Sequence, residues 1–140
     1  MEIQKIEHIG IAVKDLNKSI KFYEDVLGLK WYKIEEIKNQ KVKTAFFKVG
    51  DTKIELLEST DNEGPIGKFI EKRGEGLHHI AFGVDNLKSS LSELFDKNIK
   101  LIDVEPKEGA DDLNIVFIQP KATNGVLTEL CETKKWAEIN

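Results

Sequence analysis

The feature that most constrains the fold is a thirteen-residue pattern that occurs twice. Residues 8–20 read HIGIAVKDLNKSI, and residues 79–91, which begin 71 positions later, read HIAFGVDNLKSSL. Five of the thirteen aligned positions are identical, and most of the others exchange similar residues. Such a repeat indicates two copies of one supersecondary unit. Because a unit of about 60 residues buries little surface alone, the 140 residues predict a single domain built from two modules that share a core.

The alternation of apolar and polar residues predicts the elements of the first module, at about residues 1–60. We expect a strand over residues 3–13, followed by a helix that Asp15 caps and that runs to about Leu27. Three strand-like runs follow, separated by turns at residues 39–40 and 50–51. The first module is therefore predicted to be βαβββ.

A connector at about residues 61–76 carries a short helix that begins near Pro65, and the series then restarts. In the second module, at about residues 77–135, we expect one strand over 77–84 and a helix over about 86–96. The remaining strands are predicted in residues 99–103, 114–120 and 125–132, with a polar loop over 105–113. The residues expected to face inward from the two long helices are Leu16, Ile20, Tyr23 and Leu27, and Leu87, Leu91, Leu94 and Phe95.

Composition narrows the classes of partner. The net charge of −4 combines 21 basic and 25 acidic residues that are interspersed, so we expect neither a nucleic-acid partner nor a membrane surface. No apolar run reaches the length of a membrane span, and the N-terminus lacks the pattern of a secretory signal. The single cysteine, Cys131, cannot form an intrachain disulfide. These features predict a cytoplasmic protein.

Each module carries a histidine early and a glutamate late. His8 and His79 begin the repeated pattern, while Glu55 in KIELLE and Glu129 in LTELCE lie at equivalent places in the last strands. If the modules pair about a pseudo-twofold axis, these four side chains can converge on one divalent ion such as Co, Ni, Mn or Zn. Four protein ligands on an octahedral ion leave two positions for water or substrate, as a catalytic metal site requires.

The residues beside the two histidines are unusually small. Gly10 and Ala12 share a strand face with His8, and Ala81 and Gly83 share one with His79. A packed core fills such positions with larger side chains, so we expect these faces to line a cup that contains the metal. Cys131 shares the face of Glu129 and is expected to line the cup without reacting.

Simpler interpretations exist for each residue. A single histidine on a strand is more often a hydrogen-bonded structural residue, and a glutamate on a strand can be solvated. The metal site is favoured because the histidine–glutamate pair occurs in both modules, and because the residues beside each glutamate are apolar. His78 should point to the opposite face and receives no role. Glu58 and Glu132, which end their strands, are expected to be exposed.

The sequence resembles the vicinal oxygen chelate superfamily, and within it methylmalonyl-CoA epimerase. The resemblance rests on IEHIGIAVKDL, GDTKIELLE, GPIGKFIEKRGEGLHHIAF and NGVLTELCE, and it covers nearly the whole chain. It implies an α+β, glyoxalase-like fold in which two paired βαβββ modules form a cup-shaped mixed β-sheet. It also implies a homodimer, with Co, Mn or a similar divalent ion held by His8, Glu55, His79 and Glu129.

The resemblance implies an isomerase that interconverts the (R) and (S) forms of methylmalonyl-CoA through a metal-stabilised enolate. Glu129 is the first candidate for the group that removes the C2 proton. Some epimerases carry a glutamate where this chain has Thr44, which leaves the second proton-transfer group open. The chain also departs from the family at Gln119 and at residues 111–114. Two alternatives remain, a glyoxalase I-type lactoylglutathione lyase and a ligand-binding protein without catalytic activity.

Overall fold

The computed structural model describes residues 1–133, which divide into two compact units. The N-terminal unit is His8–His78, and the described part of the C-terminal unit consists of Met1–Glu7 together with residues 79–133. The second module is predicted to begin at about residue 77, after a connector over about 61–76. In the structure, the connector residues belong to the N-terminal unit, and residues 1–7 belong to the C-terminal unit. Residues 134–135, with which the second predicted module ends, lie outside the described residues.

The N-terminal unit contains the elements predicted for the first module and for the connector. Its described strands run in the order β2-β3-β4-β1, with β1 parallel to β4 and β3 antiparallel to both of its neighbours. The bounds are β1 Ile3–Ala12, of which residues 8–12 belong to this unit, α1 Leu16–Lys21, β2 Trp31–Ile37, β3 Val42–Val49, β4 Thr52–Ser59 and α2 Pro65–Arg73. This confirms the order βαβββ for residues 8–59.

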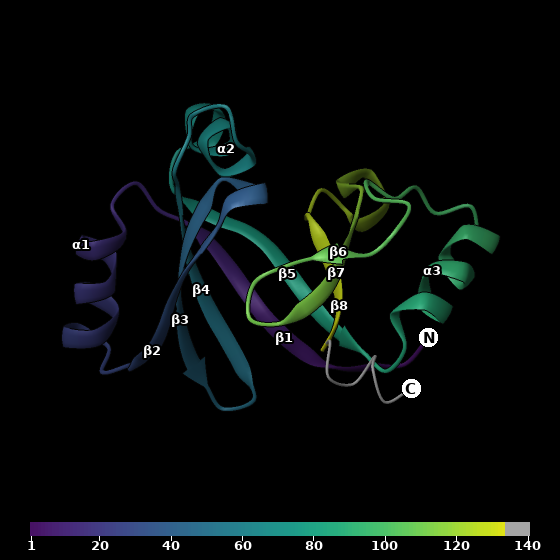
Figure 1. The fold of residues 1–140 in the computed structure, drawn as a ribbon, viewed down its shortest axis with the longest axis horizontal. Coiled ribbons are helices and arrows are strands. Elements are labelled where there is room, and N and C mark those ends of the chain that lie inside the picture. The colour runs from purple at the N-terminus through teal and green to yellow at the C-terminus, as the bar shows by residue number, and fades with distance from the viewer. Residues whose placement is uncertain (134–140) are drawn as a thin grey trace. The chain divides into compact units, whose positions relative to one another are not determined.

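Helix α1 covers one side of the strands of its unit (Figure 1). The carboxylate of Asp15 accepts a hydrogen bond from the Lys18 backbone N–H at 3.1 Å, so Asp15 is the N-cap, as predicted. Leu16 and Ile20 are buried against residues of β3 and β4.

The end of this helix differs from the prediction. Residues Phe22–Val26 form a π-helical turn, and Gly28 follows with a φ of +73°. Because a π turn takes more residues than an α turn, it rotates the later side chains away from the apolar stripe. The prediction that Leu27 faces inward is therefore wrong, since 53% of Leu27 is exposed.

The turns of the N-terminal unit follow the sequence signals. A short 3-10 helix at Lys38–Gln40 ends at Lys41 with a φ of +54°, and the β3–β4 turn contains Gly50 with a φ of +61°. Pro65 occupies the first turn of α2, where a missing backbone N–H costs nothing, and Ile66 is buried.

The C-terminal unit repeats the same topology. Its described strands run in the order β5-β8-β7-β6, and β5 is parallel to β8 just as β1 is parallel to β4. The bounds are β5 Gly76–Val84, of which residues 79–84 belong to this unit, α3 Leu87–Asp96, β6 Lys107–Glu108, β7 Leu113–Ile118, a 3-10 helix at Pro120–Thr123 and β8 Thr128–Thr133.

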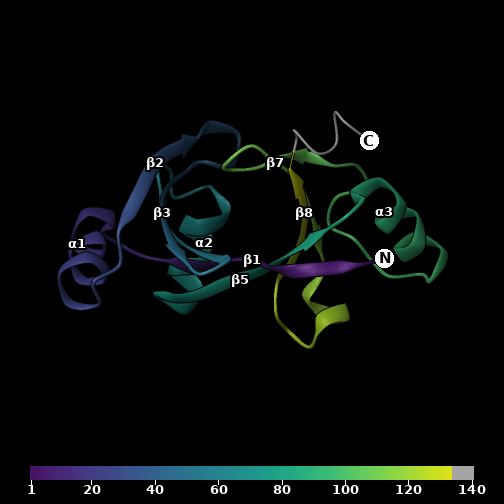
Figure 2. The same ribbon diagram turned by 90° about the horizontal axis from the view of Figure 1, so that it is seen from below.

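Helix α3 packs on β5, β7 and β8, and Figure 2 shows it beside these strands. The side chain of Asn86 caps it by accepting from the Ser89 N–H at 2.9 Å. Leu87, Leu91 and Leu94 are buried as predicted, but Phe95 is 77% exposed. The prediction for Phe95 is wrong because this residue lies beyond the edge of the stripe that the three leucines define.

The prediction of a strand at residues 99–103 is also wrong. Leu101 makes an isolated bridge to Ile118, and the Ile102 N–H donates to the Phe117 carbonyl at 2.8 Å. The Phe117 N–H donates instead to the carboxylate of Asp103 at 3.0 Å, so a side chain replaces the backbone acceptor that a ladder needs. The short strand β6 forms in the predicted 105–113 loop.

Among residues 1–133, none of the helices has both the length and the apolar character needed to cross a bilayer.

Candidate functional site

His8 and Glu55 form a buried pair in the N-terminal unit. They lie on the adjacent parallel strands β1 and β4, where Gly10 is the register partner of Glu55. The His8 Nδ1 atom lies 3.1 Å from Glu55 Oε2, and both side chains are only 3% exposed. Gly10 and Ala12, which follow on the same face of β1, are buried too. A carboxylate this far from water depends on a polar or charged partner.

His79 and Glu129 form the equivalent pair in the C-terminal unit. They lie on β5 and β8, where Ala81 is the register partner of Glu129. The His79 Nε2 atom lies 3.6 Å from Glu129 Oε1, with side-chain exposures of 6% and 4%. The ring of Phe117 meets the imidazole edge to face, with the centroids 5.8 Å apart. The topological repeat thus produces the same chemical pair in each unit.

The residues of each pair fit a divalent metal ion. Each pair supplies one imidazole nitrogen and one carboxylate, which are ligand types that first-row divalent ions accept. In both pairs the atoms are held close together in a place that excludes bulk water. A cation there would compensate the charge of each buried carboxylate.

Thr44 and Phe46 are two residues apart on β3, so their side chains share one face of the sheet. Phe46 is the cross-strand partner of Glu55. The threonine is completely buried, and its Oγ1 has no hydrogen-bond partner within residues 1–133. Buried hydroxyl groups in proteins are normally hydrogen bonded. This hydroxyl is therefore available to a molecule that binds on this face.

His78 differs from its neighbour His79. It belongs to the N-terminal unit, and its ring meets Phe69 edge to face with a centroid distance of 5.0 Å. Burial lowers the pKa of His78 to about 4, so the imidazole is neutral at physiological pH. This contact places the His78 ring against α2, and the absence of a role for His78 in the site stays a prediction.

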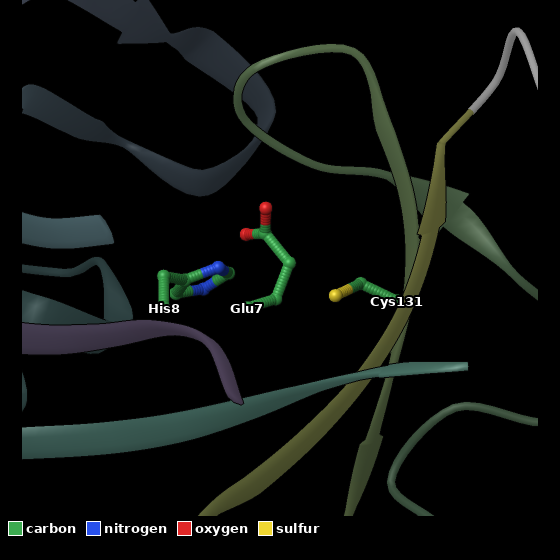
Figure 3. A group of neighbouring side chains, drawn as sticks. All are labelled: Glu7, His8 and Cys131. Atoms are coloured by element: carbon green, nitrogen blue, oxygen red, sulfur yellow. The ribbon is translucent and has the colours of Figure 1, made fainter. Parts of the chain in front are cut away.

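Cys131 is 1% exposed, and its thiol donates to the Phe82 carbonyl at 3.5 Å. Glu7, from the other end of the C-terminal unit's sequence, is also buried, with 7% exposed. In Figure 3 the Cys131 sulfur points toward the side where the Glu7 side chain lies. Both residues line a cavity of about 300 Å³ within this unit. The sequence contained no signal for Glu7, because Lys5, two residues earlier on the same face of the strand, is charged as well.

Glu58 and Glu132 have a role that the sequence interpretation missed. Glu58 Oε1 accepts a hydrogen bond from the Leu16 N–H at 3.1 Å, and Glu132 Oε2 accepts one from the Leu87 N–H at 3.4 Å. Each glutamate thus binds the first turn of the helix in its own unit, where orphan N–H groups and the helix dipole favour an anion. The prediction that both are exposed is wrong, since Glu132 is buried with 9% exposed and Glu58 is partly buried. Their equivalent positions in the repeat could have revealed the shared role.

Comparison with known proteins identifies the fold. The family model described as Glyoxalase/Bleomycin resistance protein/Dioxygenase superfamily matches residues 7–117. A Streptomyces coelicolor methylmalonyl-CoA epimerase variant, solved in complex with 2-nitronate-propionyl-CoA, superposes with a TM-score of 0.92 at 34% identity; the match covers 95% of this chain and 96% of that one. The predicted glyoxalase-like fold is confirmed.

Two relatives match over most of the sequence. The protein YqjC of Bacillus subtilis, described as uncharacterized, is 46% identical over 94% of each chain. The mitochondrial methylmalonyl-CoA epimerase of Mus musculus is 35% identical over 92% of this chain and 73% of that protein. The chain therefore belongs to the Glyoxalase/Bleomycin resistance protein/Dioxygenase superfamily, and within it the chain is similar to the methylmalonyl-CoA epimerases.

Proposed function

We propose that this protein is a divalent-metal-dependent methylmalonyl-CoA epimerase, an isomerase that interconverts the (R) and (S) forms of its substrate. The observation that carries the proposal is the buried imidazole–carboxylate pair found at equivalent positions of both repeats. Relatives named methylmalonyl-CoA epimerase, similar along most of the chain, support the choice of substrate.

His8, Glu55, His79 and Glu129 are the proposed metal ligands. Co is the favoured ion, and Mn, Ni and Zn are compatible with the same ligand types. Once bound, a divalent ion supplies Lewis acidity, which makes the C2 proton of a malonyl thioester easier to remove. The side chains of each pair would hold an ion, and their burial would keep bulk water from it.

The reaction requires the removal of a weakly acidic proton between a thioester and a carboxylate. Glu129 is the proposed base, because a carboxylate held beside an imidazole and shielded from bulk water is a competent acceptor. The product of this step is a planar enolate. The Streptomyces coelicolor relative was solved with a nitronate of propionyl-CoA, and a nitronate is likewise a planar anion at that carbon.

The decisive experiment measures exchange of the C2 proton of methylmalonyl-CoA in deuterium oxide by NMR. Protein loaded with Co²⁺ should exchange the proton rapidly, and a chelator should stop the exchange. The Glu129→Gln variant should lose the exchange, while Glu24→Gln, at an exposed position on the π-helical turn, should retain it. Metal-loaded protein that leaves the C2 proton unexchanged would contradict the proposal.

A lactoylglutathione lyase of Schizosaccharomyces pombe is also a relative, with 34% identity over 71% of this chain and 39% of that protein. A glyoxalase I-type activity uses related proton-transfer chemistry. Turnover of a glutathione hemithioacetal without exchange of methylmalonyl-CoA would identify that activity. Metal-free protein that binds an acyl-CoA without turnover would instead indicate a ligand-binding protein. The homodimer and the cytoplasmic location remain predictions.

A further inference from the structure

A row of three side chains crosses neighbouring strands in the N-terminal unit. Lys33 of β2 is the register partner of Phe46 of β3, which is in turn the register partner of Glu55 of β4. Side chains directly opposite each other on neighbouring strands point to the same face of a sheet, so the three share one face. Phe46 therefore stands between a lysine and the glutamate that pairs with His8.

The ammonium group of Lys33 rests on the ring of Phe46. Its Nζ atom lies 5.6 Å from the ring centroid, within the range of a cation–π contact, and 3.3 Å from Glu35 Oε1. Phe46 is completely buried, whereas 36% of the Lys33 side chain is exposed. The phenyl ring thus lies between the buried part of this face and a partly exposed cation.

The C-terminal unit contains the same arrangement. Phe117 of β7 is the register partner of Glu129, and Lys107 of β6 lies opposite Ile115, two residues before Phe117 on the same face. Lys107 Nζ lies 5.1 Å from the centroid of the Phe117 ring and 3.3 Å from Asp103 Oδ1. A phenylalanine again separates a lysine from the glutamate of the pair.

The two rows occupy equivalent places in the repeat. The phenylalanines are 71 positions apart, like the two histidines of the pairs, and the lysines are 74 positions apart, like the two glutamates. A core position needs only an apolar side chain of suitable volume, and packing alone gives no reason for a lysine beside it in both units. The recurrence of lysine, phenylalanine and glutamate therefore indicates a role that both units share.

A lysine at this distance would compete for the site if nothing kept it away. An ammonium group and a divalent cation are attracted to the same buried carboxylate, and an ion pair would take up oxygens that a metal needs. Neighbouring strands are about 4.8 Å apart, so a lysine two strands from a glutamate reaches it along the sheet when the residue between them is small. A phenyl ring fills this space and also attracts the ammonium group to its own face.

We propose that Phe46 and Phe117 are positioning residues, aromatic spacers that keep the lysine of each row from pairing with the metal-binding glutamate. The inference rests on the function proposed above, because it takes Glu55 and Glu129 as metal ligands. Phe117 has a further contact, since its ring meets the His79 imidazole edge to face at a centroid distance of 5.8 Å. The spacer in the C-terminal unit thus adjoins both residues of its pair.

The test is a cycle of variants in which titration calorimetry measures the affinity for Co²⁺. Phe117→Ala opens the space between Lys107 and Glu129, so Co²⁺ should bind about 10-fold more weakly. Lys107→Met alone should bind Co²⁺ at least as tightly as the unmodified protein, because a nearby positive charge is removed. In the double variant the competing lysine is absent, so the affinity should return to within about threefold of the unmodified value.

Further variants keep the test independent of folding. Phe117→Val retains a residue that strands favour, and it should weaken Co²⁺ binding in the same direction if the alanine variant does not fold. The matched control is Phe82→Ala, which removes a partly buried phenylalanine of β5 that packs against the core residues of α3. It should lower the Tm without changing the affinity for Co²⁺. Phe46→Val, with and without Lys33→Met, should reproduce the pattern in the N-terminal unit.

Two results would overturn the spacer role. One is a Phe117→Ala variant that binds Co²⁺ as tightly as the unmodified protein. The other is a loss of affinity that Lys107→Met does not restore, which would mean that the ring acts only by packing. If the unmodified protein does not bind Co²⁺, the proposed function itself fails and the spacer role fails with it, so the two failures are distinguishable.

Discussion

The Nδ1 atom of His8 lies 3.1 Å from Oε2 of Glu55, and neither side chain is more than 3% exposed. A carboxyl group so well shielded from water needs a polar or charged partner, and His8 supplies one. The second repeat contains the same relationship between His79 and Glu129 at 3.6 Å. Each pair supplies one imidazole nitrogen and one carboxylate, the ligand types that a first-row divalent metal ion accepts.

The first prediction concerns stabilisation by metal. A ligand that binds the folded state at 100 times its Kd raises the free energy of unfolding by about 2.7 kcal/mol. Co²⁺ should therefore raise the Tm measured by differential scanning calorimetry by several degrees, and a chelator should reverse the change. The rise in Tm caused by Co²⁺ should disappear in the His79→Ala variant. It should persist in His78→Ala, in which the neighbouring histidine that is not a proposed ligand is removed. Equal increments in the two variants would argue against His79 as a ligand.

The second prediction separates the two glutamates. Glu55→Gln preserves the shape of the side chain but removes its charge, so affinity for Co²⁺ should fall by roughly 10-fold or more while proton exchange at saturating metal persists. Glu129→Gln should lower the affinity and also abolish exchange, because Glu129 is the proposed base. Titration calorimetry measures the affinity. If Glu55→Gln and Glu129→Gln exchanged the C2 proton at the same rate at saturating Co²⁺, Glu129 would not be the base.

The third prediction concerns the glutamates that cap the helices. Glu58→Ala removes the acceptor of the Leu16 N–H and should lower the free energy of unfolding by about 1 kcal/mol. Glu132→Ala should lower it less through this contact, because the Glu132 hydrogen bond to the Leu87 N–H is longer, at 3.4 Å. Urea unfolding measures both values. The exposed Glu24→Ala variant is the control, and an equal effect at positions 24 and 58 would exclude a capping role.

The fourth prediction compares two neighbours on α3. Leu94→Ala should cost about 2–5 kcal/mol of stability, because Leu94 is buried in the core of the C-terminal unit. Phe95→Ala should change stability by less than about 0.5 kcal/mol, because 77% of Phe95 is exposed. Chemical denaturation of the two variants checks the difference. A large loss for Phe95→Ala would mean that a partner covers this side chain in solution.

Local sequence signals predicted several details of the fold because their causes are local. Asp15 and Asn86 cap their helices as Asp and Asn commonly do, since a short polar side chain reaches the N–H groups of the first turn. The inward leucines of α3 followed from helical periodicity. The errors at Leu27 and at residues 99–103 came from a π-helical turn and from the Asp103 carboxylate bonding to Phe117.

By itself, the sequence determined that the chain is a repeat of two βαβββ modules, each with a histidine early and a glutamate late, because periodicity and repetition are properties of the linear order. Only the tertiary structure decided that these residues meet as buried pairs within each unit. The physical reason is that strand register joins residues far apart in the chain, and hydrogen bonding between strands sets that register.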